Sequence, residues 1–283
     1  MPSLLKCINL SKQFNGQNAI NNLSFESSSN NIGLLGPNGS GKTTFIKLML
    51  GLIRPTTGTI DLNIPINDTR VIPDHPALPL EMTIDKWLEK IEEMHGSNHL
   101  EVDVQTIFNL RGDWKIKNLS AGQRRKVALF PAFYGQPKLF ILDEPTNFLD
   151  IVSREQVLDL LWAYVKKAKA KVILATHRID EMRMFSNEVI ILREGQIYKT
   201  VKNLVDRPKS YSVEVNNSEL FESMMKEKSI DYRISEIYSG SVFEIQPSIN
   251  LWQSFAEFHK HGGEITKFNT NDELKHVIQE LIK

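Results

Sequence analysis

One stretch of the sequence combines glycines with a lysine and two threonines: Gly36-Pro37-Asn38-Gly39-Ser40-Gly41-Lys42-Thr43-Thr44. Glycines let consecutive backbone N–H groups turn toward an anion, and the positive end of a following helix adds to that field. In such a loop the lysine reaches the β- and γ-phosphates of a nucleotide, and the hydroxyl of Thr43 contacts Mg²⁺. The stretch therefore predicts a site for a nucleoside triphosphate and its magnesium ion.

The segments on either side of this stretch fit that interpretation. The apolar run Ile32-Gly33-Leu34-Leu35 precedes it and is typical of a buried strand. The residues from Phe45 to Leu50 follow it with apolar spacing that predicts a helix, and Gly51 stands where a helix ends. Strand, glycine-rich loop and helix together form the context that a phosphate-binding loop requires.

Two further apolar runs end in residues that can take part in phosphoryl transfer. Leu139-Phe140-Ile141-Leu142 is followed by Asp143 and Glu144, and the run beginning at Lys171 is followed by His177. Open parallel sheets bind ligands at the carboxyl ends of their strands. We therefore expect Asp143 to contact the hydrated Mg²⁺, Glu144 to take a proton from the attacking water, and His177 to donate to the γ-phosphate.

Each of these residues also has a structural interpretation. Asp143 and Glu144 can cap helices as strand-end carboxylates, and a single histidine such as His177 is often structural. Asp74, in a proline-bounded loop, can approach the metal or its waters. Phe14, at the turn of a predicted hairpin, can lie against a purine or simply close the end of a strand.

The rest of the pattern predicts an α/β fold with a mostly parallel sheet flanked by helices. An N-terminal hairpin (strands 4–10 and 19–25) comes first, and a helical region of about residues 74–134 lies between the loop and Asp143. That region has predicted helices at 83–95, 101–110 and 121–134, the last kinked at Pro131. A further helix is predicted at 153–169. Residues 1–205 are expected to form one domain.

After residue 205 the pattern changes, and Arg207-Pro208-Lys209 is typical of a linker. The order of predicted elements in 206–283 is a split βαββαβ unit with one added helix: strands 211–215, 231–237, 241–246 and 264–268, and helices 217–228, 249–260 and 271–282. Residues 206–283 are therefore expected to form a small α+β C-terminal domain.

Composition excludes several classes of protein. Lys+Arg and Asp+Glu number 34 each in 283 residues, so the neutral net charge disfavours nucleic acid as the main partner. No apolar run is long enough to span a membrane, and the first residues lack the layout of a signal peptide. Cys7 is the only cysteine, which excludes an internal disulfide. A cytoplasmic protein fits these observations.

Taken together, the motifs resemble the ATPase cassette of the ABC family, over roughly residues 1–205. Gly36–Thr44 resembles its Walker A (P-loop) and Leu139–Glu144 its Walker B strand. His177 corresponds to the family's switch histidine, and Phe14 to its adenine-stacking aromatic residue. Asn147-Phe148-Leu149-Asp150 stands where the D-loop does, which places Asp150 there. The segment Leu119-Ser120-Ala121-Gly122-Gln123 is similar to the LSGGQ signature, which separates this family from other P-loop ATPases.

The resemblance implies a mechanism that no single loop does. Two copies of the chain, or two similar cassettes, would face each other head to tail, with ATP and Mg²⁺ between one Walker A loop and the partner's signature. Ser120 and Gly122 would then contact the γ-phosphate across the interface. The resemblance further implies an attached membrane permease on a separate chain, a place on the inner face of the membrane, and export. It does not identify the substrate.

Three departures from the family pattern and two alternatives remain. Ala121 replaces a signature glycine, Asp74 stands where most members carry a glutamine, and Pro131 occupies a position usually held by a basic residue. One alternative is a soluble ABC ATPase acting on ribosomes or DNA, although there is one cassette here and no room for a long coiled coil between Lys42 and Leu119. The other is a regulatory cassette that binds ATP without hydrolysing it.

Overall fold

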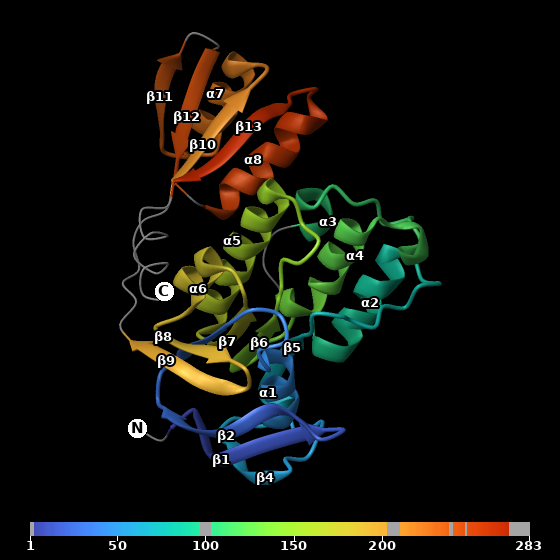
Figure 1. The fold of residues 1–283 in the computed structure, drawn as a ribbon. Helices are drawn as coiled ribbons and strands as arrows, with labels where there is room; N and C mark the ends of the chain where they lie inside the picture. The colour runs from blue at the N-terminus through green and yellow to red at the C-terminus, as the bar shows by residue number, and fades with distance from the viewer. Residues whose placement is uncertain (1–2, 97–102, 203–209, 238–239, 247, 272–283) are drawn as a thin grey trace. The chain divides into compact units, whose positions relative to one another are not determined.

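The computed structural model describes residues 3–96, 103–202, 210–237, 240–246 and 248–271. The chain forms two compact units (Figure 1). The first unit comprises Met1–Pro76, Gly135–Pro145 and Tyr164–Asp206. The second unit comprises Ala77–Tyr134, Thr146–Ala163 and Arg207–Lys283. The domain boundary expected near residue 205 falls among residues outside the described ranges and stays a prediction.

The first unit is built on a sheet with the strand order β5-β6-β7-β3-β8-β9. Its strands are β3 (Asn31–Leu35), β5 (Thr69–Ile72), β6 (Leu139–Asp143), β7 (Lys171–Thr176), β8 (Glu188–Arg193) and β9 (Gln196–Lys202). All neighbours pair in parallel except β8 and β9, which form an antiparallel edge. The register aligns Leu35 with Thr176 and Asp143 with Ala175, so the strand ends that carry the predicted site meet at one edge.

A smaller antiparallel sheet of order β2-β1-β4 belongs to the same unit. It contains β1 (Leu5–Phe14), β2 (Gln17–Ser27) and β4 (Thr57–Leu62). The predicted N-terminal hairpin is confirmed, with longer strands than expected because Asn15 and Gly16 both adopt the positive φ of a tight two-residue turn. Helix α1 (Lys42–Met49) places Phe45 and Ile46 in a core shared with Ile32 and Leu34.

The helical part of the second unit contains α2 (Ile84–His95), α3 (Val104–Ile107), η2 (Ile116–Asn118), α4 (Ala121–Ala128) and η3 (Phe130–Phe133). Thr83 caps α2 as expected. The predicted helix 121–134 is wrong in its length: α4 ends at Ala128, and Pro131 lies in the first turn of a separate 3₁₀ helix, because proline offers no N–H to continue an α-helix. The helix predicted for 101–110 is likewise reduced to α3, and residues 101–102 lie outside the described ranges.

Helix α5 (Ile151–Ala168) continues from the second unit into the first, and α6 (Ile179–Phe185) follows β7. The last part of the second unit contains β10 (Ser210–Val215), α7 (Ser218–Glu227), β11 (Tyr232–Ile237), β12 (Gly240–Ile245), α8 (Ile249–Lys260) and β13 (Ile265–Asn271). The strands form an antiparallel sheet of order β11-β12-β10-β13, which confirms the predicted split βαββαβ arrangement.

The two helices of this arrangement, α7 and α8, are joined to its sheet by contacts between aromatic rings. Phe221 on α7 contacts Phe243, and Trp252 on α8 contacts Tyr211. The prediction of a helix at 271–282 is wrong at its first residue, because Asn271 is the last residue of β13. Residues 272–282 lie outside the described ranges. Among the described helices, none combines the length and the apolar character that crossing a membrane requires.

Candidate functional site

The loop that joins β3 to α1 needs glycine at two of its positions. A Cβ atom at Gly36 would lie 2.4 Å from the carbonyl oxygen of Leu192, and one at Gly41 would lie 2.5 Å from that of Ala19. Gly41 also has a φ of 102° where it caps α1, a conformation that L side chains rarely adopt. Close backbone packing and helix geometry therefore explain these glycines, and the loop leads directly into the N-terminus of α1.

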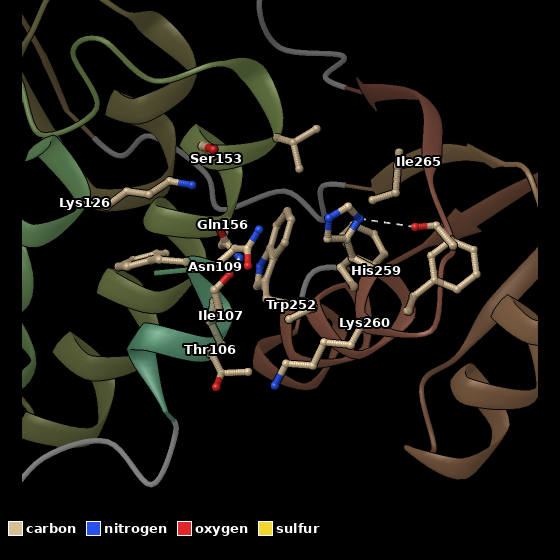
Figure 2. A pocket seen from close by; sticks show the side chains of 16 residues that line it. Thr106, Ile107, Asn109, Lys126, Ser153, Gln156, Trp252, His259, Lys260 and Ile265 are labelled. Atoms are coloured by element: carbon tan, nitrogen blue, oxygen red, sulfur yellow. Dashed lines mark hydrogen bonds between the residues drawn. The ribbon is translucent and has the colours of Figure 1, made fainter. Parts of the chain in front are cut away.

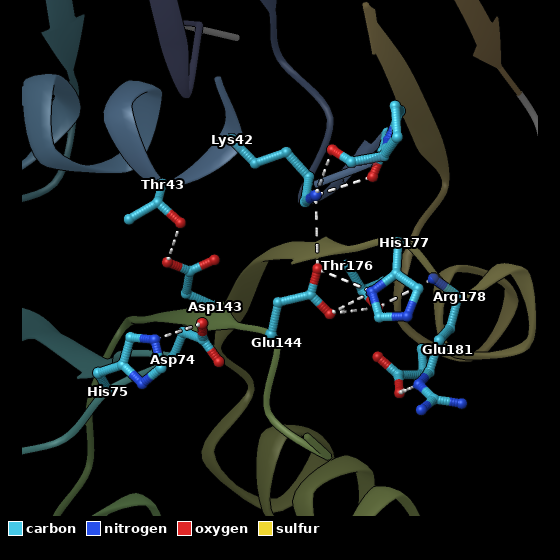
Figure 3. Close-up of polar contacts among 12 residues, drawn as sticks. Lys42, Thr43, Asp74, His75, Asp143, Glu144, Thr176, His177, Arg178 and Glu181 are labelled. Carbon is cyan, nitrogen blue, oxygen red and sulfur yellow. Dashed lines mark hydrogen bonds and ion pairs between the residues drawn. The ribbon is translucent and has the colours of Figure 1, made fainter. Parts of the chain in front are cut away.

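Lys42 opens α1, and its side chain is folded back into the loop (Figure 3). Its Nζ donates hydrogen bonds to the carbonyl oxygens of Gly36 at 2.7 Å and Pro37 at 3.2 Å. The same ammonium lies 3.4 Å from Oε1 of Glu144 in an ion pair in which both side chains are buried. The loop and the end of β6 therefore meet at a single positive charge.

Thr43 joins the loop to the neighbouring residue of β6. Its Oγ1 donates a hydrogen bond of 2.8 Å to Oδ2 of Asp143, the last residue of the strand. Burial raises the pKa of the Asp143 carboxyl, and the carboxylates of Asp74 and Glu144 raise it further, while the Thr43 hydrogen bond and the charge of Lys42 oppose the shift. A cation placed here would remove this repulsion between carboxylates.

Glu144 lies at the centre of the cluster (Figure 3). His177 places Nδ1 at 3.1 and 2.9 Å from the two carboxylate oxygens, and Thr176 donates from Oγ1 to Oε2 at 3.2 Å. The backbone of Glu144 has a φ of 47°, and its N–H donates to the carbonyl of Ala175 at 2.8 Å. The adjoining ends of β6 and β7 therefore turn this carboxylate toward Lys42 and His177.

Sequence reasoning missed Thr176, which also accepts a hydrogen bond of 3.1 Å from the backbone N–H of Arg178. Its position directly before His177 at the end of an apolar run was the available signal. Asp74 follows β5 near Asp143, and its Oδ2 lies 3.4 Å from Nε2 of His75 (Figure 3). The structure thus brings Lys42, Thr43, Asp143 and Glu144 together with His177, and adds Asp74 at the side of Asp143.

The arrangement fits a magnesium ion that is shared with a bound phosphate group. Mg²⁺ usually takes one or two protein oxygens and completes its shell with water and phosphate oxygens. Thr43 and Asp143 offer a hydroxyl and a carboxylate within hydrogen-bond distance of each other. Within the described ranges, no group of three or more His, Cys, Asp or Glu side chains could hold a metal ion by itself.

Phe14 ends β1 at the turn of the hairpin and is about half exposed. Nζ of Lys12 lies 5.0 Å from the centroid of its ring, an arrangement that fits a cation–π contact. Phe14 takes no part in the polar cluster around Glu144. The ring is partly open to solvent, and its role in stacking on adenine stays a prediction.

The segment 119–123 belongs to the second unit and starts helix α4. Ser120 and Gln123 form a capping box: the N–H of Gln123 donates to Oγ of Ser120 at 3.2 Å, and the N–H of Ser120 donates to Oε1 of Gln123 at 2.9 Å. Ala121 is exposed and Leu119 is buried. A Cβ atom at Gly122 would lie 3.1 Å from the carbonyl oxygen of Phe148, so a larger residue would require that neighbour to move.

Asp150 precedes α5 in the same unit and occupies the position of its N-cap. Its Oδ1 accepts a hydrogen bond of 2.9 Å from the backbone N–H of Ser153. Burial alone would raise the pKa of the Asp150 carboxyl, but the hydrogen bonds from Ser153 and the charge of Lys126 outweigh burial and lower it. The carboxylate therefore has a structural role in starting α5, whatever it does for a ligand.

Known proteins resemble this chain in sequence. A sequence profile of the ABC transporter family matches residues 20–147. The zinc import ATP-binding protein ZnuC of Rickettsia bellii is 35% identical over 189 residues, which cover 65% of this chain and 80% of that protein. The chain belongs to the ABC transporter family of ATP-binding proteins. Its likeness to transporter subunits does not favour the alternative of an ATPase that acts on ribosomes or DNA.

One further relative and one solved structure also resemble this chain. The bacitracin transport ATP-binding protein BcrA of Bacillus licheniformis is 25% identical over 301 residues. The match covers 100% of this chain and 98% of BcrA. Among solved structures, one described as the ATP-binding subunit of an ABC transporter has a TM-score of 0.59 and 25% identity, covering 70% of this chain and 90% of its own. The P-loop core with its N-terminal antiparallel sheet and helical part therefore has the fold of an ABC cassette. The small α+β part with the strand order β11-β12-β10-β13 is described by the structure itself.

Proposed function

We propose that this chain is the ATP-hydrolysing subunit of an ABC transporter and that it drives a separate membrane permease. One observation carries the proposal: Glu144 lies in contact with Lys42, Thr176 and His177 directly beside the Thr43–Asp143 pair. Membership of the family supports ATP as the nucleotide. The carboxylate of Glu144 argues against a cassette that binds ATP without hydrolysing it.

Nucleotide binding would use the loop and the start of α1. The backbone N–H groups of residues 36–44 would surround the β- and γ-phosphates, and Lys42 would exchange its carbonyl partners for phosphate oxygens. Thr43 and Asp143 would hold Mg²⁺, Asp74 would contact its waters, and Phe14 would stack on the adenine. When bound, the magnesium ion neutralises charge on the β- and γ-phosphates.

Hydrolysis would then depend on the residues around Glu144. Its carboxylate would accept a proton from the water that attacks the γ-phosphate. Thr176 and His177 hold the two carboxylate oxygens in place, and His177 would also donate a hydrogen bond to the γ-phosphate. Lys42 would stabilise the negative charge that is spread over the transferred phosphoryl group. Positioning and electrostatics supply most of the rate in this reaction.

A second copy of the chain would complete the site. The capping box leaves Ser120 and Ala121 exposed at the N-terminus of α4, where the helix dipole favours an anion. Ser120 and Gly122 of one copy would contact the γ-phosphate held by the other copy, with Leu119, Ala121 and Gln123 shaping that turn. Asp150 would lie at the same interface. ATP binding would close the pair and hydrolysis would open it.

We further propose that this cycle is transmitted to an integral membrane permease and serves export. One relative that matches across the full length, including residues after about 205, is named for bacitracin transport. The relative named for zinc import matches over 65% of the chain. The protein would lie on the cytoplasmic face of the membrane, and residues 206–283 would form its C-terminal domain.

The replacement Glu144→Gln tests the catalytic assignment. It keeps the size of the side chain and removes the proton acceptor, so we expect ATP hydrolysis to fall by about 100-fold or more while ATP affinity is retained. Phosphate release measures the first quantity, and binding of a fluorescent ATP analogue measures the second. Glu227→Gln, at the exposed end of α7, is the matched control and should hydrolyse ATP normally. Unchanged hydrolysis in Glu144→Gln would refute the assignment.

A further inference from the structure

The two oxygens of the Glu144 carboxylate have different surroundings (Figure 3). Oε1 lies 3.4 Å from the Lys42 ammonium, whereas Oε2 accepts a hydrogen bond of 3.2 Å from the hydroxyl of Thr176. Nδ1 of His177 lies 3.1 Å from Oε1 and 2.9 Å from Oε2, so it hardly distinguishes between them. Lys42 and Thr176 therefore make the two carboxylate oxygens unequal.

The backbone after β7 orients the hydroxyl group of Thr176. Oγ1 of Thr176 accepts a hydrogen bond of 3.1 Å from the backbone N–H of Arg178. A hydroxyl group carries one proton, and that proton cannot point toward a group that is itself donating. The proton is therefore directed to Oε2 of Glu144, the acceptor on the other side.

Thr176 and Glu144 are both shielded from solvent. The exposed fraction is 0% for Thr176 and 6% for Glu144, so water competes little for the hydrogen bond between them. A hydrogen bond to a charged acceptor is also stronger than one between neutral groups. The parallel register of β7 with β3 pairs Thr176 with Leu35, so strand pairing holds the backbone that carries this hydroxyl.

The surroundings of Oε1 would change when the nucleotide binds. In the proposed function, on which this inference rests, Lys42 turns to the phosphate oxygens of ATP. Its ammonium would then leave Oε1, whereas the hydrogen bond from Thr176 to Oε2 would remain. Because the Lys42 ammonium is also bound to the carbonyl oxygens of Gly36 and Pro37, Oε1 is the oxygen that faces the phosphate-binding loop.

We propose that Thr176 is a positioning residue that makes Oε1 the oxygen of Glu144 that receives the proton. A carboxylate oxygen that already accepts a hydrogen bond from a hydroxyl group is the weaker proton acceptor of the two. An O–H bond of the attacking water breaks, and its proton binds Oε1. The water oxygen forms a bond to the γ-phosphorus, and the bond from that phosphorus to the bridging oxygen breaks, which leaves ADP and inorganic phosphate. Thr176 acts only through Glu144.

Thr176→Val tests this role, because it removes the hydroxyl group and keeps the branching of the side chain. We expect the single-turnover rate of hydrolysis at saturating ATP to fall about tenfold, since the catalytic carboxylate loses one hydrogen bond. The affinity for a fluorescent ATP analogue should change by less than about twofold, because the hydroxyl group does not contact the nucleotide.

Thr106→Val is the matched control. The hydroxyl group of Thr106 also donates to a carboxylate, that of Asp103, and Thr106 lines a pocket of the second unit (Figure 2). The variant therefore loses the same kind of hydrogen bond at a place with no assigned role in ATP hydrolysis. It should hydrolyse ATP at the rate of the wild type.

A second pair of variants keeps the test decisive if Thr176→Val does not fold. Thr176→Ser retains the hydroxyl group and Thr176→Ala does not, so the serine variant should hydrolyse ATP about tenfold faster than the alanine variant. Thr176→Val combined with Glu144→Gln should be no slower than Glu144→Gln alone, because Thr176 acts through that carboxylate. Equal rates for the serine and alanine variants, or a further loss in the combined variant, would overturn the proposal.

The same measurements distinguish the role of Thr176 from the proposed function. If Glu144→Gln stops hydrolysis while Thr176→Val keeps the rate of the wild type, only the role of Thr176 is overturned. If Glu144→Gln hydrolyses ATP normally, the assignment of Glu144 is refuted and the role of Thr176 with it. A loss of ATP affinity in Thr176→Val as large as its loss of rate would also overturn the proposal, since it would indicate a disturbed binding site.

Discussion

Glu144 is held in an unusual backbone conformation by its neighbours. A residue other than glycine with a φ of 47° is uncommon, and such conformations persist where the surrounding structure fixes them. Here the backbone N–H is bound to Ala175 and the carboxylate to Thr176, His177 and Lys42. The strain is consistent with a carboxylate that must point at one place, which is what proton transfer to a positioned water requires.

Most of this site could be predicted from residue types and spacing, because its members follow apolar runs that become neighbouring parallel strands. Lys42, Thr43, Asp143 and His177 were all identified in this way. Thr176 was not, because its role depends on the register between β6 and β7, which places Asp143 opposite Ala175.

The stability of the protein should depend on pH through the carboxyl group of Asp150. The pKa of this carboxyl is lowered in the folded protein, so it contributes stability above its unfolded pKa of about 4, and that contribution is lost as pH falls through the folded pKa. Asp150→Asn keeps a good N-cap but removes the charge. We expect the variant to be less stable than the wild type at pH 6 to 7, and the gap in urea midpoint to close on acidification. A gap that widens toward low pH would contradict this.

Helix α4 shows how an element can serve both stability and function. Ser120 caps it and is also the residue proposed to contact the partner's nucleotide, whereas Thr83 caps α2 without such a role. Ser120→Ala and Thr83→Ala should each lower the free energy of unfolding by about 1 kcal/mol, because both lose an N-cap. Only Ser120→Ala should also weaken ATP-dependent dimerisation. Urea unfolding and sedimentation separate the two effects, and equal loss of dimer in both variants would reject the role of Ser120.

The ends of elements were harder to predict than their existence. The pattern indicated a helix from 121 to 134 with a kink, whereas α4 stops at Ala128 and a 3₁₀ helix follows. Pro131 cannot donate a backbone hydrogen bond, and the chain resolves this with a new, tighter turn in which proline is acceptable. A pattern of apolar residues cannot distinguish a kinked helix from two short ones, because Phe130 and Phe133 are buried in either case.

As the ATPase of a transporter, this chain would need a membrane partner. Leu80 and Met94 are exposed apolar residues of the segment 74–118, which we expect to contact the permease. The tagged chain should co-purify with an integral membrane protein from solubilised membranes, and Leu80→Glu with Met94→Glu should reduce the yield of that partner severalfold. Ile66→Glu, at an exposed apolar residue of the first unit, is the matched control. Recovery of only ribosomes or nucleic acid would reject the transporter assignment.

Sedimentation equilibrium of Glu144→Gln tests most directly whether two copies of the chain enclose the nucleotide. With saturating ATP and Mg²⁺ the variant cannot turn over, so we expect the mass to rise from that of the 32.4 kDa monomer to twice that value. Without nucleotide, and in Ser120→Ala combined with Glu144→Gln, it should remain a monomer. A Glu144→Gln protein that is saturated with ATP and still sediments as a monomer would contradict the account.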